Sequence, residues 1–401
     1  MQLGEKDKVI NELLKYSDSY SALKDKVTIR GNIISVNSSE FVYNNPILIS
    51  VGKSSIKMAK FFLEHTPIKK GIIITPEASH NERFPLDVFI STHPEISERS
   101  LEAGRKVVEL LTKEDYDLVI FLISGGASAL MEYSDIPLDV LKEINMKLIT
   151  SGLGIDQINT IRKHLSLIKG GWMLKYSKSP ILTFVISDVP GGDLTMVGSG
   201  PTLIDQTTKE DAENVLRSIG LGAYSVYLKE TPKTSKVKSY VYKVLDVESV
   251  LIKLKNTFQQ AEVLSSEIRG DAYSFGIQLA GIANTLSRLR EGKKILLFGG
   301  EPDVKITGKH GKGGRNGEVC LGFLKYIKTD AILYAFATDG IDGNSDYAGC
   351  YVSDQLRINS LEIEEAIETH SSYELLERYG SVIKTGYTGN NVNNIYLLEI
   401  S

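Results

Sequence analysis

Five short apolar segments that end abruptly in glycine, serine, aspartate or lysine limit the folds open to this chain more than any other feature. None shows the alternation of apolar and polar residues that marks a strand with one wet face, so each reads as a strand buried on both faces. Such strands predict parallel sheets covered by helices. The segments are PILISVGKSS (46–55), LVIFLISGGASA (118–129), ILTFVISDVPGGD (181–193), KILLFGGE (294–301) and ILYAFATDGIDG (332–343).

Amphipathic segments between these runs supply the expected helices. Residues 54–66, 100–113 and 269–294 carry apolar residues at spacings of three and four. Strands that alternate with helices along the chain indicate the α/β fold class.

The length of 401 residues predicts two domains. The polar, lysine-rich segment 226–240, interrupted by Pro232, is where we expect the junction. We place the boundary near residue 236, between an N-terminal α/β domain (1–236) and a C-terminal α/β domain (237–401).

Composition narrows the classes of partner. The formal net charge of -4 and a pI of about 6.0 give no overall electrostatic reason to bind nucleic acid or an anionic membrane. Cys320 and Cys350 lie in no metal-type or CxxC spacing, which indicates neither a disulfide framework nor a zinc site. The charged N-terminus is unlike a signal peptide, and no run reaches membrane-spanning length. We therefore expect a soluble cytoplasmic protein with small-molecule partners, no nucleic acid and no membrane; a homodimer stays open.

The glycine-rich and charged segments of the chain follow the predicted strands. Ligands of open α/β sheets bind beyond the carboxyl ends of the strands, so these segments are the candidates for a site. Lys53 follows the first run, where its ammonium can neutralise a phosphoryl group, although a solvated surface lysine is the alternative. ISGGASALM (123–131) ends a strand, and its glycines and the start of a helix can hold a phosphate. An ordinary turn explains that motif equally well. The expected nucleotide contacts here are Ser124, Gly125, Gly126, Ala127 and Ser128.

Two further segments lie in the N-terminal half. SDVPGGD places Asp188 and Asp193 on one glycine-rich loop, where they could hold Mg²⁺ or accept a proton from a substrate hydroxyl. NTIRKHLSLIKGG puts Arg162, Ser166 and Lys169 on one face of an expected helix, able to meet an anion. A solvated basic face is the alternative, and His164 by itself is more typical of a structural residue.

The stretch GGEPDVKITGKHGKGGRNGE (299–318) holds seven glycines and four basic residues in twenty positions. Ordering so flexible a loop without a ligand is costly in entropy, so phosphate binding explains it better than solvation. We expect Gly299, Gly300 and Glu301 at a strand end to face a nucleotide. Lys309 and Lys312 lie on the loop, and Arg315 at a helix start can reach a phosphoryl group with two hydrogen bonds.

The acidic segment FATDGIDGNSDYAG (336–349) follows the last apolar run. Its Asp339, Asp342, Asn344 and Asp346 lack the spacing of an EF-hand loop. We expect it to contribute carboxylates to the same site.

These segments, in this order, resemble the class II glycerate kinases, the glycerate 2-kinases with a C-terminal MOFRL module. The motifs that carry the resemblance span residues 47–396 and include SGGASAL, IRKHLSLIKGG, SDVPGGD, GGEPDV, GKGGRNGE, ATDGIDG and TGYTGNNVNNI.

The resemblance implies a larger Rossmann-like N-terminal α/β/α sandwich with a parallel sheet, a smaller C-terminal α/β domain and an active site in the cleft between them. It also implies transfer of the γ-phosphoryl group of ATP to D-glycerate with Mg²⁺, giving 2-phosphoglycerate. By motif, Lys53 and Arg315 are the residues important for transfer. Arg162 or Lys169 would hold the glycerate carboxylate, and Lys53 and Arg315 would also contact the substrate.

The chain departs from the family pattern TGPTGTNVND near its C-terminus. Tyr387 stands for proline, and Asn390 and Asn394 stand for threonine and aspartate. Two other functions stay open at this point: a nicotinamide-dependent hydroxypyruvate reductase, although no strand is followed by G-x-G-x-x-G, and a non-catalytic nucleotide-binding protein.

Overall fold

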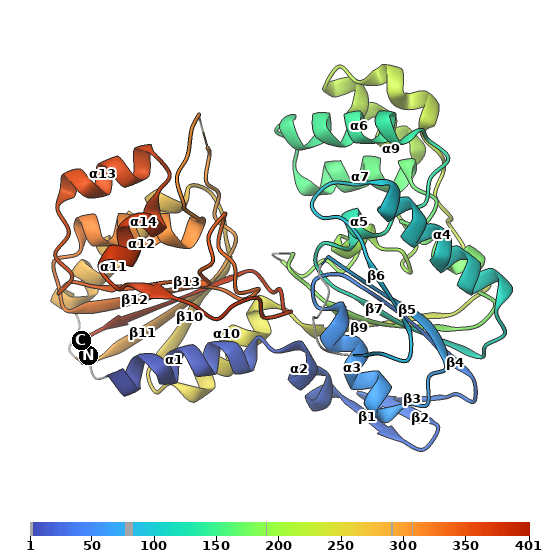
Figure 1. Ribbon diagram of the computed structural model, residues 1–401, viewed down its shortest axis with the longest axis horizontal. Helices are drawn as coiled ribbons and strands as arrows, with labels where there is room; N and C mark the ends of the chain where they lie inside the picture. The colour runs from blue at the N-terminus through green and yellow to red at the C-terminus, as the bar shows by residue number, and fades with distance from the viewer. Residues whose placement is uncertain (1–2, 77–82, 190, 290–291, 307) are drawn as a thin grey trace. The chain divides into compact units, whose positions relative to one another are not determined.

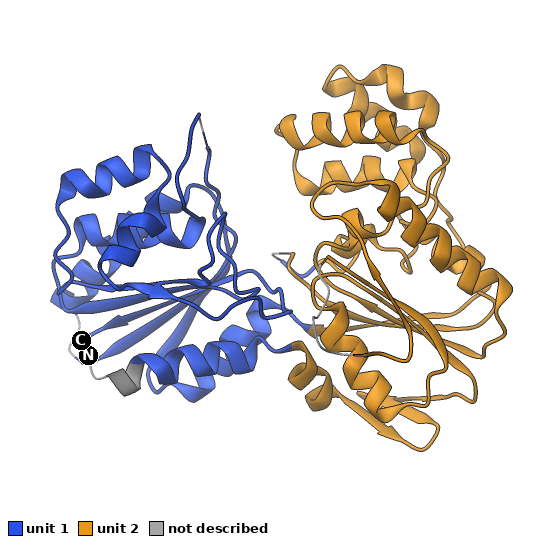
Figure 2. Cartoon of the chain, in the orientation of Figure 1, with its two compact units in different colours: residues 1–18, 190–192, 245–401 blue, residues 19–189, 193–244 orange. Residues whose placement is uncertain are grey.

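A computed structural model describes residues 3–76, 83–189, 191–289, 292–306 and 308–401 of the protein (Figure 1). The chain forms two compact units (Figure 2). Unit 1 comprises residues 1–18, 190–192 and 245–401, and unit 2 comprises residues 19–189 and 193–244. No helix among the described residues is long and apolar enough to cross a membrane.

Unit 2 is built on a six-stranded sheet in the order β6-β5-β4-β7-β8-β9. Its strands β6, β5, β4, β7 and β8 pair in parallel, and every residue of β4, β7 and β8 is buried. The predicted parallel sheet of doubly buried strands is therefore confirmed here. The strands are β4 (Pro46–Val51), β5 (Lys70–Thr75), β6 (Asp87–Ile90), β7 (Leu118–Ile123), β8 (Ile181–Ile186) and β9 (Ser239–Leu245).

Helices cover both faces of this sheet because its side chains alternate between two apolar surfaces. Ile47 and Ile49 pack in one cluster with Val107 of α4, while α3 packs on the opposite face through residues such as Phe62, whose ring lies beside Phe184. The helices are α2 (Ser19–Lys26), α3 (Ser55–His65), α4 (Glu98–Lys113), α5 (Ala127–Leu130) and α8 (Met173–Tyr176).

Two smaller assemblies complete unit 2. A separate apolar cluster holds together α6 (Leu138–Thr150), α7 (Ile155–Leu165), α9 (Lys209–Ser218) and η2 (Gly222–Tyr227), seen together at the top of unit 2 in Figure 1. An antiparallel meander, which the sequence analysis did not predict, is formed by β1 (Val27–Arg30), β2 (Ile33–Val36) and β3 (Ser39–Val42). The short helix η1 (Val197–Ser199) lies in a loop.

Unit 1 has a mixed sheet in the order β10-β11-β15-β12-β13-β14. The C-terminal strand β15 lies between β11 and β12 and is antiparallel to both, so the predicted all-parallel pattern does not hold in this half. Because β11 and β12 still point the same way, their carboxyl ends share one edge. The strands are β10 (Ala261–Ile268), β11 (Lys294–Gly300), β12 (Ala331–Ala337), β13 (Gly349–Ser353), β14 (Val382–Ile383) and β15 (Asn394–Ile400).

The helices of unit 1 lie on both sides of its sheet, with α1 and α10 on one side and α11 to α14 on the other (Figure 1). They are α1 (Leu3–Tyr16), α10 (Val247–Thr257), α11 (Ala272–Leu289), α12 (Arg315–Tyr326), α13 (Ser360–Glu368) and α14 (Ser372–Arg378).

A disulfide joins Cys320 on α12 to Cys350 on β13, so the expectation of no disulfide was wrong. Both cysteines are wholly buried in the core between helix and sheet. Their 30-residue separation carries no recognisable spacing, which is why the sequence did not reveal the pair. The bond ties the helix that begins at Arg315 to the sheet beneath it.

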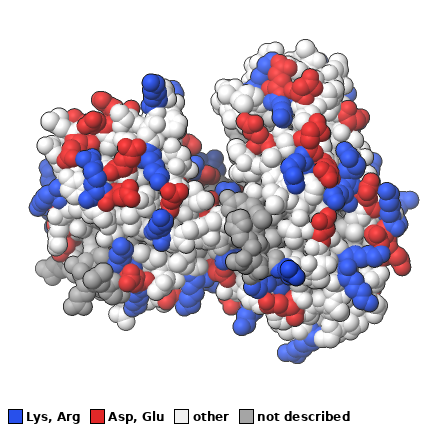
Figure 3. Space-filling model, in the orientation of Figure 1, with Lys and Arg blue, Asp and Glu red and all other residues white. Residues whose placement is uncertain are grey.

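The compact units differ from the predicted division at residue 236 at the N-terminus and at the boundary, and unit 1 also takes in part of the loop after β8. Residues 1–18 belong to unit 1, because α1 packs against α10. Strand β9 extends the sheet of unit 2, which moves the boundary to residues 244/245. On the face seen in Figure 3, acidic and basic side chains are interspersed over both units, in line with the small net charge.

Candidate active site

The turns that follow β4 and β7 are bonded to each other. The backbone N–H of Lys53 donates to the Gly125 carbonyl at 2.9 Å, and the N–H of Ser54 donates to Oγ of Ser124 at 3.0 Å. Because β4 and β7 are neighbouring parallel strands, these contacts lie at the carboxyl edge of the sheet of unit 2. The structure therefore brings together Lys53 and the predicted nucleotide turn.

Two glycines at this edge cannot be replaced without movement of their neighbours. Gly52 has φ +124°, and a Cβ there would lie 2.2 Å from Oγ of Ser124. Gly126 has φ +85°, and its missing Cβ would lie 3.0 Å from the imidazole of His93. Both positions combine a backbone conformation that favours glycine with close approach of another group. Both turns therefore depend on glycine at these positions, of which the sequence had marked Gly126 but not Gly52.

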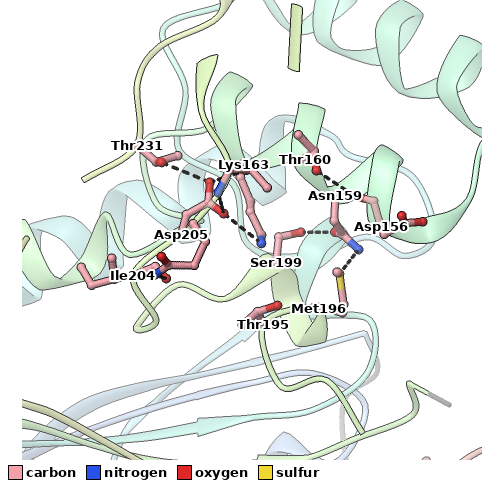
Figure 4. A network of polar contacts seen from close by, with 12 residues as sticks. Asp156, Asn159, Thr160, Lys163, Thr195, Met196, Ser199, Ile204, Asp205 and Thr231 are labelled. Carbon is pink, nitrogen blue, oxygen red and sulfur yellow. Dashed lines mark hydrogen bonds and ion pairs between the residues drawn. The ribbon is translucent and has the colours of Figure 1, made fainter. Parts of the chain in front are cut away.

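The helix expected after this turn is short. Helix α5 begins at Ala127 but ends after four residues, so its dipole contributes little to anion binding. The turn is held instead through Ser128, whose Oγ lies 3.0 Å from Oγ of Ser199. Ser199 in turn donates to Oδ1 of Asn159 at 2.7 Å, and the Asn159 amide lies 3.4 Å from the sulfur of Met196 (Figure 4). Sequence reasoning missed Ser199 and Asn159, since a lone serine or asparagine carries no pattern.

The predicted basic helix face is not formed as expected. Helix α7 ends at Leu165, where Oγ of Ser166 accepts hydrogen bonds from the N–H groups of Ile168 (3.2 Å) and Lys169 (3.3 Å). A serine side chain that bonds backbone ahead of it competes with the helix and ends it. Arg162 is therefore helical, while Ser166 and Lys169 lie on the following turn.

Lys169 lies in a buried ion pair with Glu132, a residue that the sequence analysis did not single out. The Lys169 side chain is 2% exposed and the Glu132 side chain 3%, and Ser166 donates a hydrogen bond to the same carboxylate. Burial lowers the pKa of Lys169, although Glu132 acts to raise it. Arg162, whose pKa burial also lowers, donates from Nε to Asn145 Oδ1 at 3.0 Å. Lys169 is therefore withdrawn from solvent, whereas Arg162 is partly exposed.

Lys163 of α7 and Asp205 form a second buried ion pair in unit 2. Lys163 donates to Oδ1 of Asp205 at 3.2 Å, and Thr207 and Thr231 donate to the other oxygen, as Figure 4 shows in part. Burial acts to raise the pKa of Asp205, but Lys163 and Thr207 outweigh it and lower that pKa. His164 is wholly buried and bonds the backbone of its own helix, in line with the predicted structural role.

The predicted metal ligands lie on the loop after β8. Asp188 follows the strand by two residues, and Asp193 accepts hydrogen bonds from the N–H (2.9 Å) and hydroxyl (2.7 Å) of Thr195. Both bonds go to Oδ1 of Asp193, which leaves Oδ2 for a cation. Among the described residues, no group of three or more His, Cys, Asp or Glu side chains that could hold a metal ion is assembled.

In unit 1, the structure brings together Glu301 and Arg315. Gly299 and Gly300 end β11, and the guanidinium of Arg315, the first residue of α12, is paired with the Glu301 carboxylate. The side chains are 33% and 48% exposed, so the pair lies at the surface of the carboxyl edge. The arginine is therefore placed as predicted, at a helix start beside a glycine-rich strand end.

Asp342 anchors the start of α12. Its Oδ2 accepts hydrogen bonds from the N–H groups of Asn316 (2.8 Å) and Gly317 (3.2 Å) and from the hydroxyl of Tyr373 (2.6 Å). The residue is 2% exposed, and this burial raises its pKa to about 6. A carboxylate at a helix N-terminus satisfies N–H groups that have no partner in the helix. Asp342, whose segment was expected to contribute carboxylates to the site, is thus a buried cap of α12.

Asn394 connects this cap to the strand end. Its Oδ1 accepts from the side-chain amide of Asn316 at 2.9 Å, and its own amide donates to the Gly300 carbonyl at 3.2 Å. As the first residue of β15, Asn394 faces Gly300 on one side and Ala337 on the other. Asparagine, unlike the aspartate of the family pattern, can both donate and accept.

The other departures from the pattern lie close by. Asn390 is 2% exposed, Tyr387 is 38% exposed, and the N–H of Thr388 donates to the Asp339 carbonyl at 3.0 Å. The C-terminal loop therefore packs on the loop that follows β12.

The glycine-rich loop carries its lysines at the protein surface, where Lys312 is partly buried. Lys312 pairs with Asp346 at 2.7 Å, which raises the pKa of the lysine, and Lys309 is exposed. Gly313 donates from its N–H to Oδ1 of Asn344 at 2.8 Å. The basic loop and the acidic loop predicted to share a site are thus joined to each other.

The two-unit α/β fold described above is also found in solved structures. The crystal structure of a glycerate kinase from Thermotoga maritima superposes with a TM-score of 0.82 at 28% identity, over 98% of each chain. Residues 6–229 match a domain of unknown function, DUF4147, and residues 294–394 match the MOFRL family.

The relatives with the most similar sequences include glycerate 2-kinases. A glycerate 2-kinase from Sulfurisphaera tokodaii is 55% identical over 98% of this chain and 100% of its own length. A glycerate 2-kinase from Pyrococcus horikoshii is 32% identical over 98% and 96% respectively. The chain belongs to the MOFRL-containing glycerate 2-kinase family.

Proposed function

We propose that this protein transfers the γ-phosphoryl group of ATP to D-glycerate and forms 2-phosphoglycerate. The observation that carries the proposal is the bonded pair of turns at the carboxyl edge of unit 2, which sets Lys53 against the glycine turn of Ser124 to Gly126. Backbone N–H groups and a cation at such an edge suit an anionic ligand. The glycerate 2-kinase relatives supply the reaction.

Phosphoryl transfer needs little covalent chemistry from the protein. It needs donor and acceptor held in line and the charge on the equatorial oxygens offset. We assign the charge to Lys53 of unit 2 and Arg315 of unit 1, which would serve the same reaction. The partner that Arg315 has in this structure, Glu301, would be exchanged for a phosphate oxygen.

Nucleotide binding is assigned to the two glycine-rich strand ends. Gly52 and Gly126 let these turns pack closely, because a Cβ at either position would meet Ser124 or His93. The residues proposed to contact nucleotide are Ser124, Gly125, Gly126, Ala127, Ser128, Gly299, Gly300 and Glu301.

For glycerate, Lys53 and Arg315 are proposed to hold the acceptor as well, and Arg162 is favoured over Lys169 for its carboxylate. Lys169 would have to leave a buried ion pair with Glu132 to bind an anion. Arg162 bonds the neutral amide of Asn145 instead, so its charge is not neutralised by that contact.

The residues after β8 fit Mg²⁺ in their donor type, since Mg²⁺ is commonly held by one or two carboxylates together with substrate phosphates. Asp188 and Asp193, through its Oδ2, would hold the ion. Held there, Mg²⁺ would supply positive charge that offsets the negative charge of the phosphoryl group during transfer. Asp188 is also the proposed acceptor of the proton from the glycerate hydroxyl.

Phosphorus NMR of the product formed from D-glycerate and Mg-ATP tests the proposal. We expect 2-phosphoglycerate, which is distinguishable from 3-phosphoglycerate, and no consumption of ATP without glycerate. Formation of 3-phosphoglycerate would refute the proposed position of phosphorylation. Consumption of ATP at the same rate without glycerate would refute glycerate as the acceptor.

The reductase alternative is tested in the same preparation. Hydroxypyruvate and a reduced nicotinamide cofactor are added, and the absorbance of the cofactor is followed. Sedimentation of the purified chain tests the homodimer.

A further inference from the structure

We propose that His370 is a positioning residue for Arg315: it fixes the α13–α14 turn (residues 369–371), to which the glycine-rich loop before Arg315 is bonded. The inference rests on the proposed function, because His370 would affect phosphoryl transfer only through Arg315. His370 lies outside every motif named in the sequence, and its partner Glu318, the last residue of GKGGRNGE, has no predicted role there.

The glycine-rich loop is bonded to the α13–α14 turn and to the start of α14. The N–H of Gly311 donates to the Thr369 carbonyl at 2.8 Å, and the N–H of Tyr373 donates to the Lys312 carbonyl at 3.0 Å. The N–H of Lys312 donates to Oε1 of Glu374 at 2.8 Å. These hydrogen bonds help to offset the entropy cost of ordering the loop, which the sequence attributes to a ligand.

The loop also lies against the backbone of His370 itself. A Cβ on Gly313 would lie 2.3 Å from the His370 carbonyl oxygen, so only glycine allows this approach without movement. A single residue, Gly314, separates Gly313 from Arg315. A shift of the His370 carbonyl would therefore move the backbone that leads into Arg315.

The side chain of His370 joins the α13–α14 turn to α12. Its Nδ1 lies 2.8 Å from Oε1 of Glu318, and the two side chains are 14% and 5% exposed. An ionised carboxylate only accepts hydrogen bonds, so the imidazole donates from Nδ1. Burial raises the pKa of Glu318, whereas the hydrogen bond from His370 acts to lower it. Since Glu318 lies in the first turn of α12, the bond connects the turn to the helix that Arg315 begins.

The backbone conformation of His370 decides which substitutions test its side chain alone. Its φ is +47°, in the left-handed region, which glycine and asparagine tolerate and alanine does not. His370→Gly therefore removes the donor without added backbone strain, and His370→Asn keeps a donor near the position of Nδ1.

Two further variants complete the set. Glu318→Ala removes the acceptor from within a helix and should behave as His370→Gly does, which keeps the inference testable if His370→Gly does not fold. Gln260→Gly is the matched control, because Gln260 is an exposed residue of unit 1 that also has a left-handed backbone, with φ +62°.

Steady-state kinetics of these variants, alone and combined with Arg315→Ala, is the test. We expect His370→Gly to lower kcat/KM about ten- to a hundredfold, the scale of a lost hydrogen bond to a charged group, with His370→Asn closer to wild type and Gln260→Gly unchanged. With Arg315→Ala, His370→Gly should cause no further loss, because it would act through the missing guanidinium.

Three outcomes overturn the inference. One is wild-type kinetics in His370→Gly and Glu318→Ala. Another is a His370→Asn variant no better than His370→Gly. The third is an equal fold-loss with and without Arg315, which is the result that a merely structural role predicts.

Failure of the proposed function is recognised separately. If the wild type shows no glycerate-dependent consumption of ATP, that function fails whatever the variants do. Hydrogen–deuterium exchange of residues 308–318, which needs no substrate, then decides whether His370 holds the loop. Faster exchange in His370→Gly that His370→Asn restores supports the inference, and exchange equal to that of the wild type in His370→Gly overturns it. Unfolding temperatures show whether each variant is folded.

Discussion

The carboxyl edges of the two sheets hold their cations by different means. In unit 2, Lys53 lies on a turn bonded to a second turn through backbone groups and serine hydroxyls, with glycines where side chains would clash. In unit 1, Arg315 begins a helix whose first turn is held by a buried carboxylate and by side-chain amides. In the parallel sheet, the turns after the neighbouring strands β4 and β7 lie side by side and bond directly. In the mixed sheet, β15 lies between β11 and β12, so side chains connect the strand end to the helix start.

The difference extends to the charged pairs. Unit 2 buries Lys169 with Glu132, while unit 1 leaves Arg315 and Glu301 partly exposed. A buried pair is costly to break, since the remaining charge stays without compensation, whereas an exposed pair is screened by water. We infer that the unit 2 pair is structural and that the unit 1 pair can exchange partners with a ligand.

The largest expected effect comes from breaking the buried pair. Lys169→Met should lower the free energy of unfolding by about 3–5 kcal/mol, because it leaves the Glu132 carboxylate buried and unpaired. Urea unfolding measures this. The double variant Glu132→Gln/Lys169→Met should recover most of the loss, and Arg315→Met, the matched change in unit 1, should cost less than about 1 kcal/mol. Equal costs for the two single variants would contradict the comparison.

The buried cap of unit 1 should make stability depend on pH in the opposite direction to Asp205 of unit 2, whose pKa is lowered. Burial raises the pKa of Asp342 to about 6 from 3.8, so the folded state holds this proton more tightly than the unfolded state. The stabilisation is complete below the unfolded pKa and is lost as the pH rises through about 6. Two units of pKa correspond to about 3 kcal/mol.

Asp342→Asn removes this ionisation while it keeps an oxygen for the helix N–H groups. We therefore expect the difference in unfolding free energy between variant and wild type to shift in favour of the variant by about 3 kcal/mol between pH 4 and pH 7. Unfolding curves across that range measure it. A difference that does not change with pH would show that Asp342 is ionised in the folded state at pH 4.

The two cations should matter to a similar extent for catalysis. Lys53→Ala and Arg315→Ala are each expected to lower kcat/KM at least about a hundredfold, the scale of a lost transition-state contact, without unfolding the chain. Steady-state kinetics with both substrates measures this. Lys113→Ala and Arg288→Ala, exposed cations at the ends of α4 and α11, are the controls. Near-normal turnover in Lys53→Ala or in Arg315→Ala would refute the proposed role of that residue in phosphoryl transfer.

The smallest effect is expected at Asn394. Asn394→Asp replaces the amide that donates to the Gly300 carbonyl with a carboxylate oxygen. The lost donor and the buried charge should cost about 1–2 kcal/mol at pH 7. Thermal unfolding of Asn394→Asp beside the wild type measures it. An unchanged midpoint would mean that the aspartate of the family pattern fits the same site and that the link between strand end and helix start is not needed.

The sequence predicted the elements that local chemistry dictates. Uninterrupted apolar runs gave the buried strands of unit 2, and glycines at their ends marked turns whose backbone conformations glycine favours, as at Gly52 and Gly126. Lys53 and Arg315 follow strand ends or begin a helix because the chain order alone puts them there. What failed was the extension of a helical spacing past Leu165, since a single serine side chain ended the helix.

Contacts between distant segments could be decided only by the tertiary structure. The pairing of Lys169 with Glu132, the disulfide between Cys320 and Cys350 and the capping of α12 by Asp342 each join residues whose spacing has no pattern. The same holds for the imidazole of His93 over Gly126. Local propensity and hydrophobic periodicity act over a few residues and are written in the chain, whereas a charge, a cap or a close approach depends on which groups folding brings within a few ångströms.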